Sequence, residues 1–104
     1  MAFTTINLTE PVIADELATY GAKPGQHDAF RDGIAVFAVN TGSSSISAGT
    51  VYITAGGELK GSSSSGYLTG KTLAACPAGA GIYVIVQGIV PGSTPAYQAY
   101  TIAS

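Results

Sequence analysis

The stretch ISAGTVYITAGGELK, residues 46–60, decides the fold of this chain. Side chains alternate between the two faces of a strand, so Val51 and Ile53 point to one face and Tyr52 points to the other. Gly56 and Gly57 can both take a positive φ, as the two central residues of a type I′ turn require. The stretch therefore predicts a β-hairpin with a turn at Gly56-Gly57.

Further strands are expected on both sides of this hairpin. Residues 34–39, IAVFAV, are apolar throughout, which is typical of a strand buried on both faces. Residues 82–90, IYVIVQGIV, carry the strongest β signal and are placed centrally, with Gly88 marking a bulge or bend. A weaker strand is expected at 67–74 and a final strand at 97–102. Short strands joined by glycine-rich turns predict a mainly β fold, a small antiparallel β-barrel or sandwich.

Charge divides the chain into two segments. Residues 1–33 hold seven of the ten charged side chains, and residues 34–104 hold only three. We therefore expect an N-terminal arm over 1–33 and a β body over 34–104. Within the arm, Thr9 as N-cap, Pro11 in the first turn and Gly21 after the last turn predict a short helix near 10–20. The glycine- and proline-containing segment 21–33 is expected to be a loop.

Composition excludes several classes of function. The 104 residues carry only 10% charged side chains and a net charge of −2, and the four basic residues are scattered, which argues against a nucleic-acid partner. No apolar run reaches the roughly 18 residues of a membrane span. The N-terminus has no recognisable signal peptide, so we expect synthesis in the cytoplasm. So little charge on a small domain favours a surface that partners cover.

No residues suggest an enzyme, a metal site or a cofactor site. His27 is the single histidine, it is expected to be solvated in a polar loop, and no GxSxG motif accompanies it. Asp28 and Asp32 with Gln26 offer oxygen ligands to a cation, but a calcium loop needs more of them at regular spacing. The pair Asp15-Glu16 gives no sign of a raised pKa. We therefore assign no catalytic, metal or cofactor-binding residue.

The remaining candidates are interpreted as structural. Cys76 is the single cysteine, which cannot form an internal disulfide and is expected to be a small buried apolar residue. Six tyrosines raise the possibility of carbohydrate stacking, but the chain has no tryptophan. Tyr52, Tyr83 and Tyr100 lie within predicted strands and are expected to pack in the body or at an interface.

The hairpin at 46–60 resembles a pattern found in small capsid cement proteins of tailed bacteriophages. In that pattern a hairpin of the form S/A-A-G-x-x-V-Y precedes a small-residue loop, a "G-x-hydrophobic" segment and a last apolar strand. Here the continuation is YLTGKTLA at 67–74, then AGAG at 78–81 and IYVIV at 82–86. The resemblance covers roughly 34–90, while residues 1–33 have no counterpart and the tail at 91–104 is longer than the pattern.

This resemblance implies a structural virion protein without enzymatic activity. Such a protein is a β-barrel on the outer surface of the phage head. It binds at junctions between copies of the major capsid protein, often as a homotrimer, and stabilises the shell against internal DNA pressure. The alternative is a binding module, such as a tail-fibre or receptor-binding domain or a carbohydrate-binding β domain. That class is expected to show an exposed aromatic platform.

Overall fold

The computed structural model describes Leu8, Pro11 and residues 24–30 and 33–103. The described residues form eight β-strands and no helix. Pro11 is the one described residue inside the helix expected near 10–20, so that prediction lies outside the described residues, as does most of the predicted arm. The strands are β1 (His27–Phe30), β2 (Gly33–Val39), β3 (Gly49–Ile53), β4 (Leu59–Lys60), β5 (Leu68–Thr72), β6 (Gly81–Val90), β7 (Ala96–Gln98) and β8 (Thr101–Ile102).

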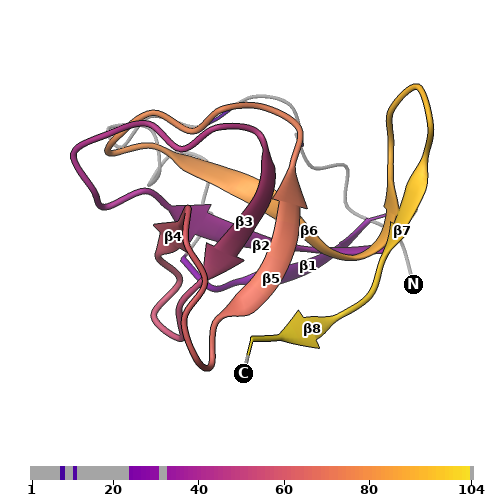
Figure 1. Ribbon diagram of the computed structural model, residues 1–104, viewed down its shortest axis with the longest axis horizontal. Coiled ribbons are helices and arrows are strands. Elements are labelled where there is room, and N and C mark those ends of the chain that lie inside the picture. The colour runs from indigo at the N-terminus through magenta and orange to yellow at the C-terminus, as the bar shows by residue number, and fades with distance from the viewer. Residues whose placement is uncertain (1–7, 9–10, 12–23, 31–32, 104) are drawn as a thin grey trace.

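All eight strands belong to one antiparallel sheet, which confirms the mainly β prediction. The main order is β1-β2-β6-β5-β3-β4, with β7 added beside β6 and β8 added beside β5. Figure 1 shows the sheet folding over itself, so that β3, β4 and β5 lie across β2 and β6. A single sheet has to bend in order to enclose a core of its own, so this curvature is what allows the sheet to form a core.

The sheet is not closed into a barrel, and the predicted barrel is wrong in this respect. Among the described residues, β2 and β4 meet only at the parallel bridge between Val39 and Glu58. β1 occupies the edge of β2 over 33–36, and β4 is only two residues long, so no ladder can form between β2 and β4. A sandwich is excluded as well, because the strands form one sheet.

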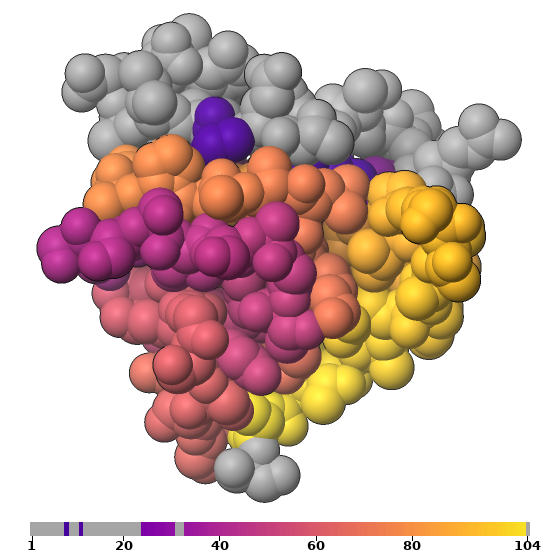
Figure 2. Space-filling view, turned by 45° about the horizontal axis from the view of Figure 1, so that its top comes forward, coloured from indigo at the N-terminus to yellow at the C-terminus, as the bar shows by residue number. Residues whose placement is uncertain are grey.

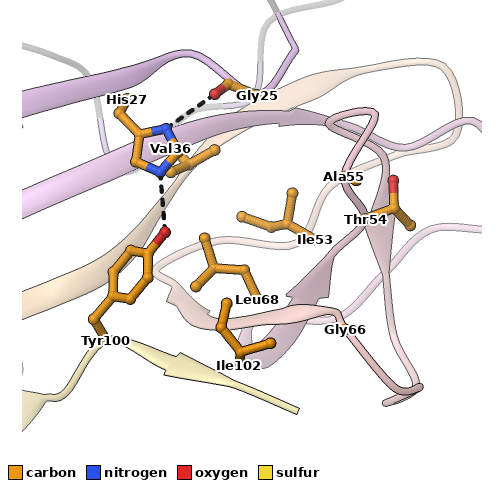
Figure 3. Close-up of a pocket in the computed structure, with 10 residues that line it drawn as sticks. All are labelled: Gly25, His27, Val36, Ile53, Thr54, Ala55, Gly66, Leu68, Tyr100 and Ile102. Atoms are coloured by element: carbon orange, nitrogen blue, oxygen red, sulfur yellow. Dashed lines mark hydrogen bonds between the residues drawn. The ribbon is translucent and has the colours of Figure 1, made fainter. Parts of the chain in front are cut away.

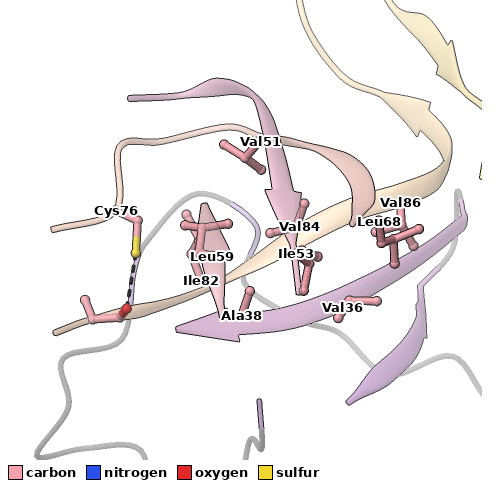
Figure 4. Close-up of a cluster of buried hydrophobic side chains, with 11 residues drawn as sticks. Val36, Ala38, Val51, Ile53, Leu59, Leu68, Cys76, Ile82, Val84 and Val86 are labelled. Atoms are coloured by element: carbon pink, nitrogen blue, oxygen red, sulfur yellow. Dashed lines mark hydrogen bonds between the residues drawn. The ribbon is translucent and has the colours of Figure 1, made fainter. Parts of the chain in front are cut away.

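The main core lies inside the fold of the sheet (Figure 4). It collects the inward-facing side chains of β2, β3, β5 and β6 together with Leu59 and Cys76. Burying each Val or Ile side chain contributes about 1.5–3 kcal/mol, so this cluster is the main source of stability. Its buried members are Val36, Ala38, Val51, Ile53, Leu59, Leu68, Cys76, Ala80, Ile82, Val84 and Val86.

A second, smaller cluster covers the other face of β2 and β6. Phe30, Ala35 and Ile85 are buried there, and Leu8 packs against them from the N-terminal segment. The two central strands are therefore buried on both faces, as their apolar runs at 34–39 and 82–90 predicted. Two described residues of the predicted arm therefore contact this face of the sheet, Leu8 and Phe30.

The hairpin predicted at 46–60 is present, but its turn is of another kind. Tyr52 pairs with Lys60 and Ile53 with Leu59, so residues 54–58 form the loop. Of the two glycines, Gly57 alone has a positive φ, at +83°, and its N–H donates to the Thr54 carbonyl at 3.0 Å. This is a four-residue turn followed by a left-handed glycine, not a type I′ turn. A Cβ on Gly57 would lie 2.4 Å from the Gly25 nitrogen, so the turn packs directly on the chain before β1.

The loop prediction for 21–33 is wrong at His27–Phe30, which form β1. His27 pairs with Val36 and Phe30 with Gly33, so β1 and β2 make a hairpin across residues 31–32. Polar residues suggested a loop, but an edge strand exposes one face, and Phe30 supplies the buried side chain. The sheet thus begins before the predicted boundary at 33/34.

The last predicted strand, 97–102, is divided into β7 and β8. β7 pairs with the end of β6, and β8 pairs with β5 through Leu68–Ile102 and Thr69–Thr101. The bend expected near Gly88 is present: the register shifts beside Val86, and Gly88 has a φ of +117°. The C-terminal chain therefore passes from one part of the sheet to another along its border (Figure 1).

Candidate functional site

The polar cluster around Asp28 joins β1 to β6. The Tyr83 hydroxyl donates to Asp28 Oδ2 at 2.9 Å, and Gln26 Nε2 donates to both carboxylate oxygens of Asp28 at 2.9 and 3.1 Å. Burial, reinforced by the neighbouring carboxylate, raises the pKa of Tyr83 to about 12. The phenol therefore stays protonated at neutral pH and acts as a hydrogen-bond donor, which gives the cluster a structural role.

The cation site considered at Gln26, Asp28 and Asp32 gains no further ligand in the structure. The Asp28 oxygens already accept bonds from Tyr83 and Gln26, and Asp32 lies outside the described residues, as do Asp15 and Glu16. Within 24–30 and 33–103, no three His, Cys, Asp or Glu side chains gather where they could share a metal ion.

His27 lies on strand β1, which corrects its predicted place in a loop. Its side chain is exposed, with Nδ1 3.1 Å from the Gly25 carbonyl oxygen and Nε2 3.4 Å from the Tyr100 hydroxyl. The two rings stand 6.3 Å apart between centroids. His27 thus contacts the C-terminal chain at Tyr100, a contact that the sequence did not predict.

A pocket opens beside His27 and Tyr100, and we call it the edge pocket (Figure 3). Its volume is about 190 Å³. Apolar side chains of β2, β3, β5 and β8 line it, with His27, Tyr100 and Thr54 as the polar side chains. None of its lining residues is Lys, Arg, Asp or Glu, so the site suits an uncharged group. The lining residues are Gly25, His27, Val36, Ile53, Thr54, Ala55, Gly66, Leu68, Tyr100 and Ile102.

Large apolar side chains are exposed next to this pocket and along the C-terminal strands. Tyr97 is 66% exposed, Ile102 53%, Tyr100 48% and Ile89 42%. Figure 2 shows the C-terminal residues, in yellow, gathered along one side of the molecule. Single exposed apolar residues are common on protein surfaces, but four in one short segment indicate a contact surface.

The predicted packing in the body is confirmed for Tyr83, whereas Tyr100, which was predicted within a strand, is exposed and lies outside the strands. Tyr83 meets the buried ring of Phe37 edge to face at 5.1 Å between centroids. Tyr52 is half-buried on β3. Tyr100 lies between β7 and β8 at the border of the edge pocket, where an interface role stays a prediction.

Cys76 is buried, as the sequence predicted. Burial raises the pKa of its thiol, against a smaller lowering by the hydrogen bond from the Asn40 backbone. The thiol donates to the Ala80 carbonyl at 3.3 Å. A protonated, enclosed thiol is a poor nucleophile, so Cys76 acts as part of the core.

Comparisons with protein-family models, with curated proteins and with solved structures gave no match. In the part of the chain that the structure describes, no helix is long and apolar enough to cross a membrane. A function for this protein therefore has to be inferred from its own residues and their geometry.

The edge pocket was not predicted from the sequence. Its walls come from β1, β2, β3, β5 and β8, and their meeting depends on how the sheet curves. The sequence offered one signal for this pocket, the apolar residue Ile102 in a short segment after a turn. Such a residue occurs both at exposed sheet edges and in buried strands, so it did not predict the pocket.

Proposed function

We propose that this protein is a non-enzymatic structural virion protein. In this proposal it is a capsid cement or decoration protein that binds the outer surface of a tailed-phage head at junctions between major capsid proteins and stabilises the shell. The observation that carries the proposal is the group of exposed apolar side chains at Ile89, Tyr97, Tyr100 and Ile102 on a sheet with open edges. A partner that covers this surface would bury apolar area and pair free main-chain groups.

The sequence pattern supports the same proposal. The hairpin that resembles those of phage cement proteins forms part of this sheet as β3 and β4. The small number of charges also fits a surface that is covered in its working state, because neutral surface is easily desolvated. A homotrimer around a threefold or quasi-threefold point remains part of the proposal, taken from the resemblance.

The alternative proposal, a carbohydrate-binding or receptor-binding module, is supported by one feature. Tyr97 and Tyr100 present exposed rings on the same segment, and a sugar ring can stack on such a face. The edge pocket has few side chains that could form hydrogen bonds with sugar hydroxyls, so its lining favours a protein partner over a sugar.

Light scattering and capsid sedimentation test the two proposals. The purified protein is mixed with expanded tailed-phage capsids, and its oligomeric state is measured separately by size-exclusion chromatography with light scattering. We expect saturable co-sedimentation at a fixed ratio to the major capsid protein. A stable monomer that ignores capsids and binds a glycan panel would overturn the cement-protein proposal.

A further inference from the structure

A row of apolar side chains crosses three strands and stops at an open edge. Ile53 on β3 pairs with Leu68 on β5, and Leu68 pairs with Ile102 on β8. The exposed fraction rises along the row, from 3% to 7% to 53%. Among the described residues, no strand pairs with the outer side of β8. No described strand therefore occupies the next position of the row.

The main-chain groups of Ile102 at this position make no hydrogen bond to another described residue. The Ala103 N–H donates to the Tyr67 carbonyl at 2.7 Å, and the Ala103 carbonyl accepts from the Gly66 N–H at 2.8 Å. Both groups of Ala103 thus face the β5 side. Successive residues of a strand direct their main-chain groups to opposite sides, so the N–H and carbonyl of Ile102 face the open edge.

The edge pocket lies on the face of the sheet that the side chains of this row share. Ile102, Leu68 and Ile53 all line it, and His27 with Val36 form the opposite wall (Figure 3). In an antiparallel pair, residues directly opposite each other project their side chains to the same face. A residue paired with Ile102 on the open edge would therefore direct its side chain towards the pocket.

We propose that β8 receives an added strand from a partner protein. An extended segment pairs its main chain with Ile102 and inserts one uncharged apolar side chain, of about the size of leucine, into the edge pocket. The 190 Å³ volume has room for such a side chain, and the absence of charged lining residues favours an uncharged one. This mode combines main-chain hydrogen bonds with a side-chain pocket. The inference rests on the proposed function only for the identity of the partner, which would be a segment of the capsid surface.

Peptide titration of the full-length protein tests the inference. The probes are acetyl-TTLTT-amide, its TTATT and TTDTT analogues, and TTLTT with an N-methylated leucine, followed by ¹H–¹⁵N NMR. We expect TTLTT to shift the amide signals of Ile102 and Gly66 at concentrations on the order of millimolar. TTATT should bind about tenfold more weakly, because it buries less apolar surface. TTDTT and the N-methylated peptide should not bind measurably.

Two isoleucines provide a matched pair of variants. Ile102→Ser should weaken TTLTT binding about tenfold, because it removes apolar surface beside the pocket. Ile89→Ser changes another exposed isoleucine, which does not line the pocket, and should leave binding unchanged. Both side chains are exposed, so both variants should fold.

The outcomes separate this inference from the proposed function. Equal binding of TTLTT and its N-methylated form, no binding at millimolar concentrations, or equal effects of the two variants would overturn the added strand. If indole alone shifts the pocket signals and the peptides do not, the pocket is a small-molecule site and the inference is wrong. Capsid sedimentation is scored independently: peptide binding without capsid binding would overturn the proposed function and leave the added strand standing.

Discussion

Val84 is the residue on which the core depends most directly. It lies on the central strand β6, has no exposed surface and packs in the main cluster. An ionised carboxylate at this position would be buried without a partner, at a cost of several kcal/mol. Domains of this size are stable by only about 5–15 kcal/mol, so such a cost is decisive.

We therefore expect Val84→Asp to prevent folding. Circular dichroism and thermal denaturation of the soluble fraction measure the effect. Ile89→Asp is the control, because it places the same charge on the same strand at a side chain that is 42% exposed. A Val84→Asp protein that melts cooperatively near the wild-type temperature would show that β6 is not central.

Tyr83 makes the stability of the folded protein depend on pH in the alkaline range. Its pKa is about 12 in the folded protein and about 10 when unfolded, so both states keep the proton below pH 10. Between pH 10 and 12 the unfolded state loses the proton first, and stability falls as pH rises. Tyr83→Phe removes this contribution and should flatten the decline.

Urea denaturation at pH 8 and pH 11 measures the change in unfolding free energy for each protein. Tyr97→Phe, at an exposed tyrosine on β7, is the control and should decline as the wild type does. If Tyr83→Phe declines as steeply as the wild type, the burial of the phenol and its part-buried hydrogen bond to Asp28 do not cause this pH dependence in solution.

The hairpin of β3 and β4 is the element that best shows what the sequence can and cannot predict. Alternation placed Val51 and Ile53 on the buried face correctly. Local pattern did not determine the turn, because two adjacent glycines fit more than one turn type. Gly57 has to be glycine because Pro24 and Gly25 pack against it, and that contact is distant in sequence.

Replacement of each glycine by alanine distinguishes the two turns. Gly57→Ala should cost on the order of 1–3 kcal/mol, because its φ is +83° and a Cβ would lie 2.4 Å from the Gly25 nitrogen. Gly56→Ala should change stability by less than about 0.5 kcal/mol, since its nearest neighbour is 3.9 Å away. Equal costs in denaturant unfolding would favour the type I′ turn instead.

Strands with strong apolar patterns were predicted well, and strands at the border were not. β2 and β6 are apolar on both faces because both faces are covered, and this leaves a clear sequence signal. β1 and β8 are short edge strands with few buried side chains, and β8 pairs with the distant strand β5, so HDAF resembled a loop and the tail resembled one strand. The open shape of the sheet and the edge pocket both depend on these border strands. Because the border strands carry weak sequence signals, neither feature was predicted.

The molecule combines a curved sheet with an N-terminal segment whose higher share of charged residues distinguishes it from the rest of the chain. Deleting residues 2–20 should leave the strands folded, because the main cluster contains no residue before 34. The deletion removes Leu8 from the second cluster, which should cost about 1 kcal/mol for a half-buried side chain. Under the proposed function, capsid attachment should weaken, because the deletion removes three of the ten charged residues, Glu10, Asp15 and Glu16.

Circular dichroism and capsid sedimentation measure these two effects. Leu8→Ser in the full chain is the control that separates the Leu8 contact from the rest of the deleted segment. Loss of the β signal on deletion would show that residues 2–20 are part of the folded core.

At the scale of the whole molecule, the proposed function requires that the protein cover part of a capsid surface. Electron cryo-microscopy of expanded capsids, imaged with and without the purified protein, tests it most directly. We predict added density on the outer surface at junctions between major capsid proteins, with the C-terminal strands β7 and β8 facing the shell. Capsids that remain bare at saturating protein concentration would contradict the proposed function.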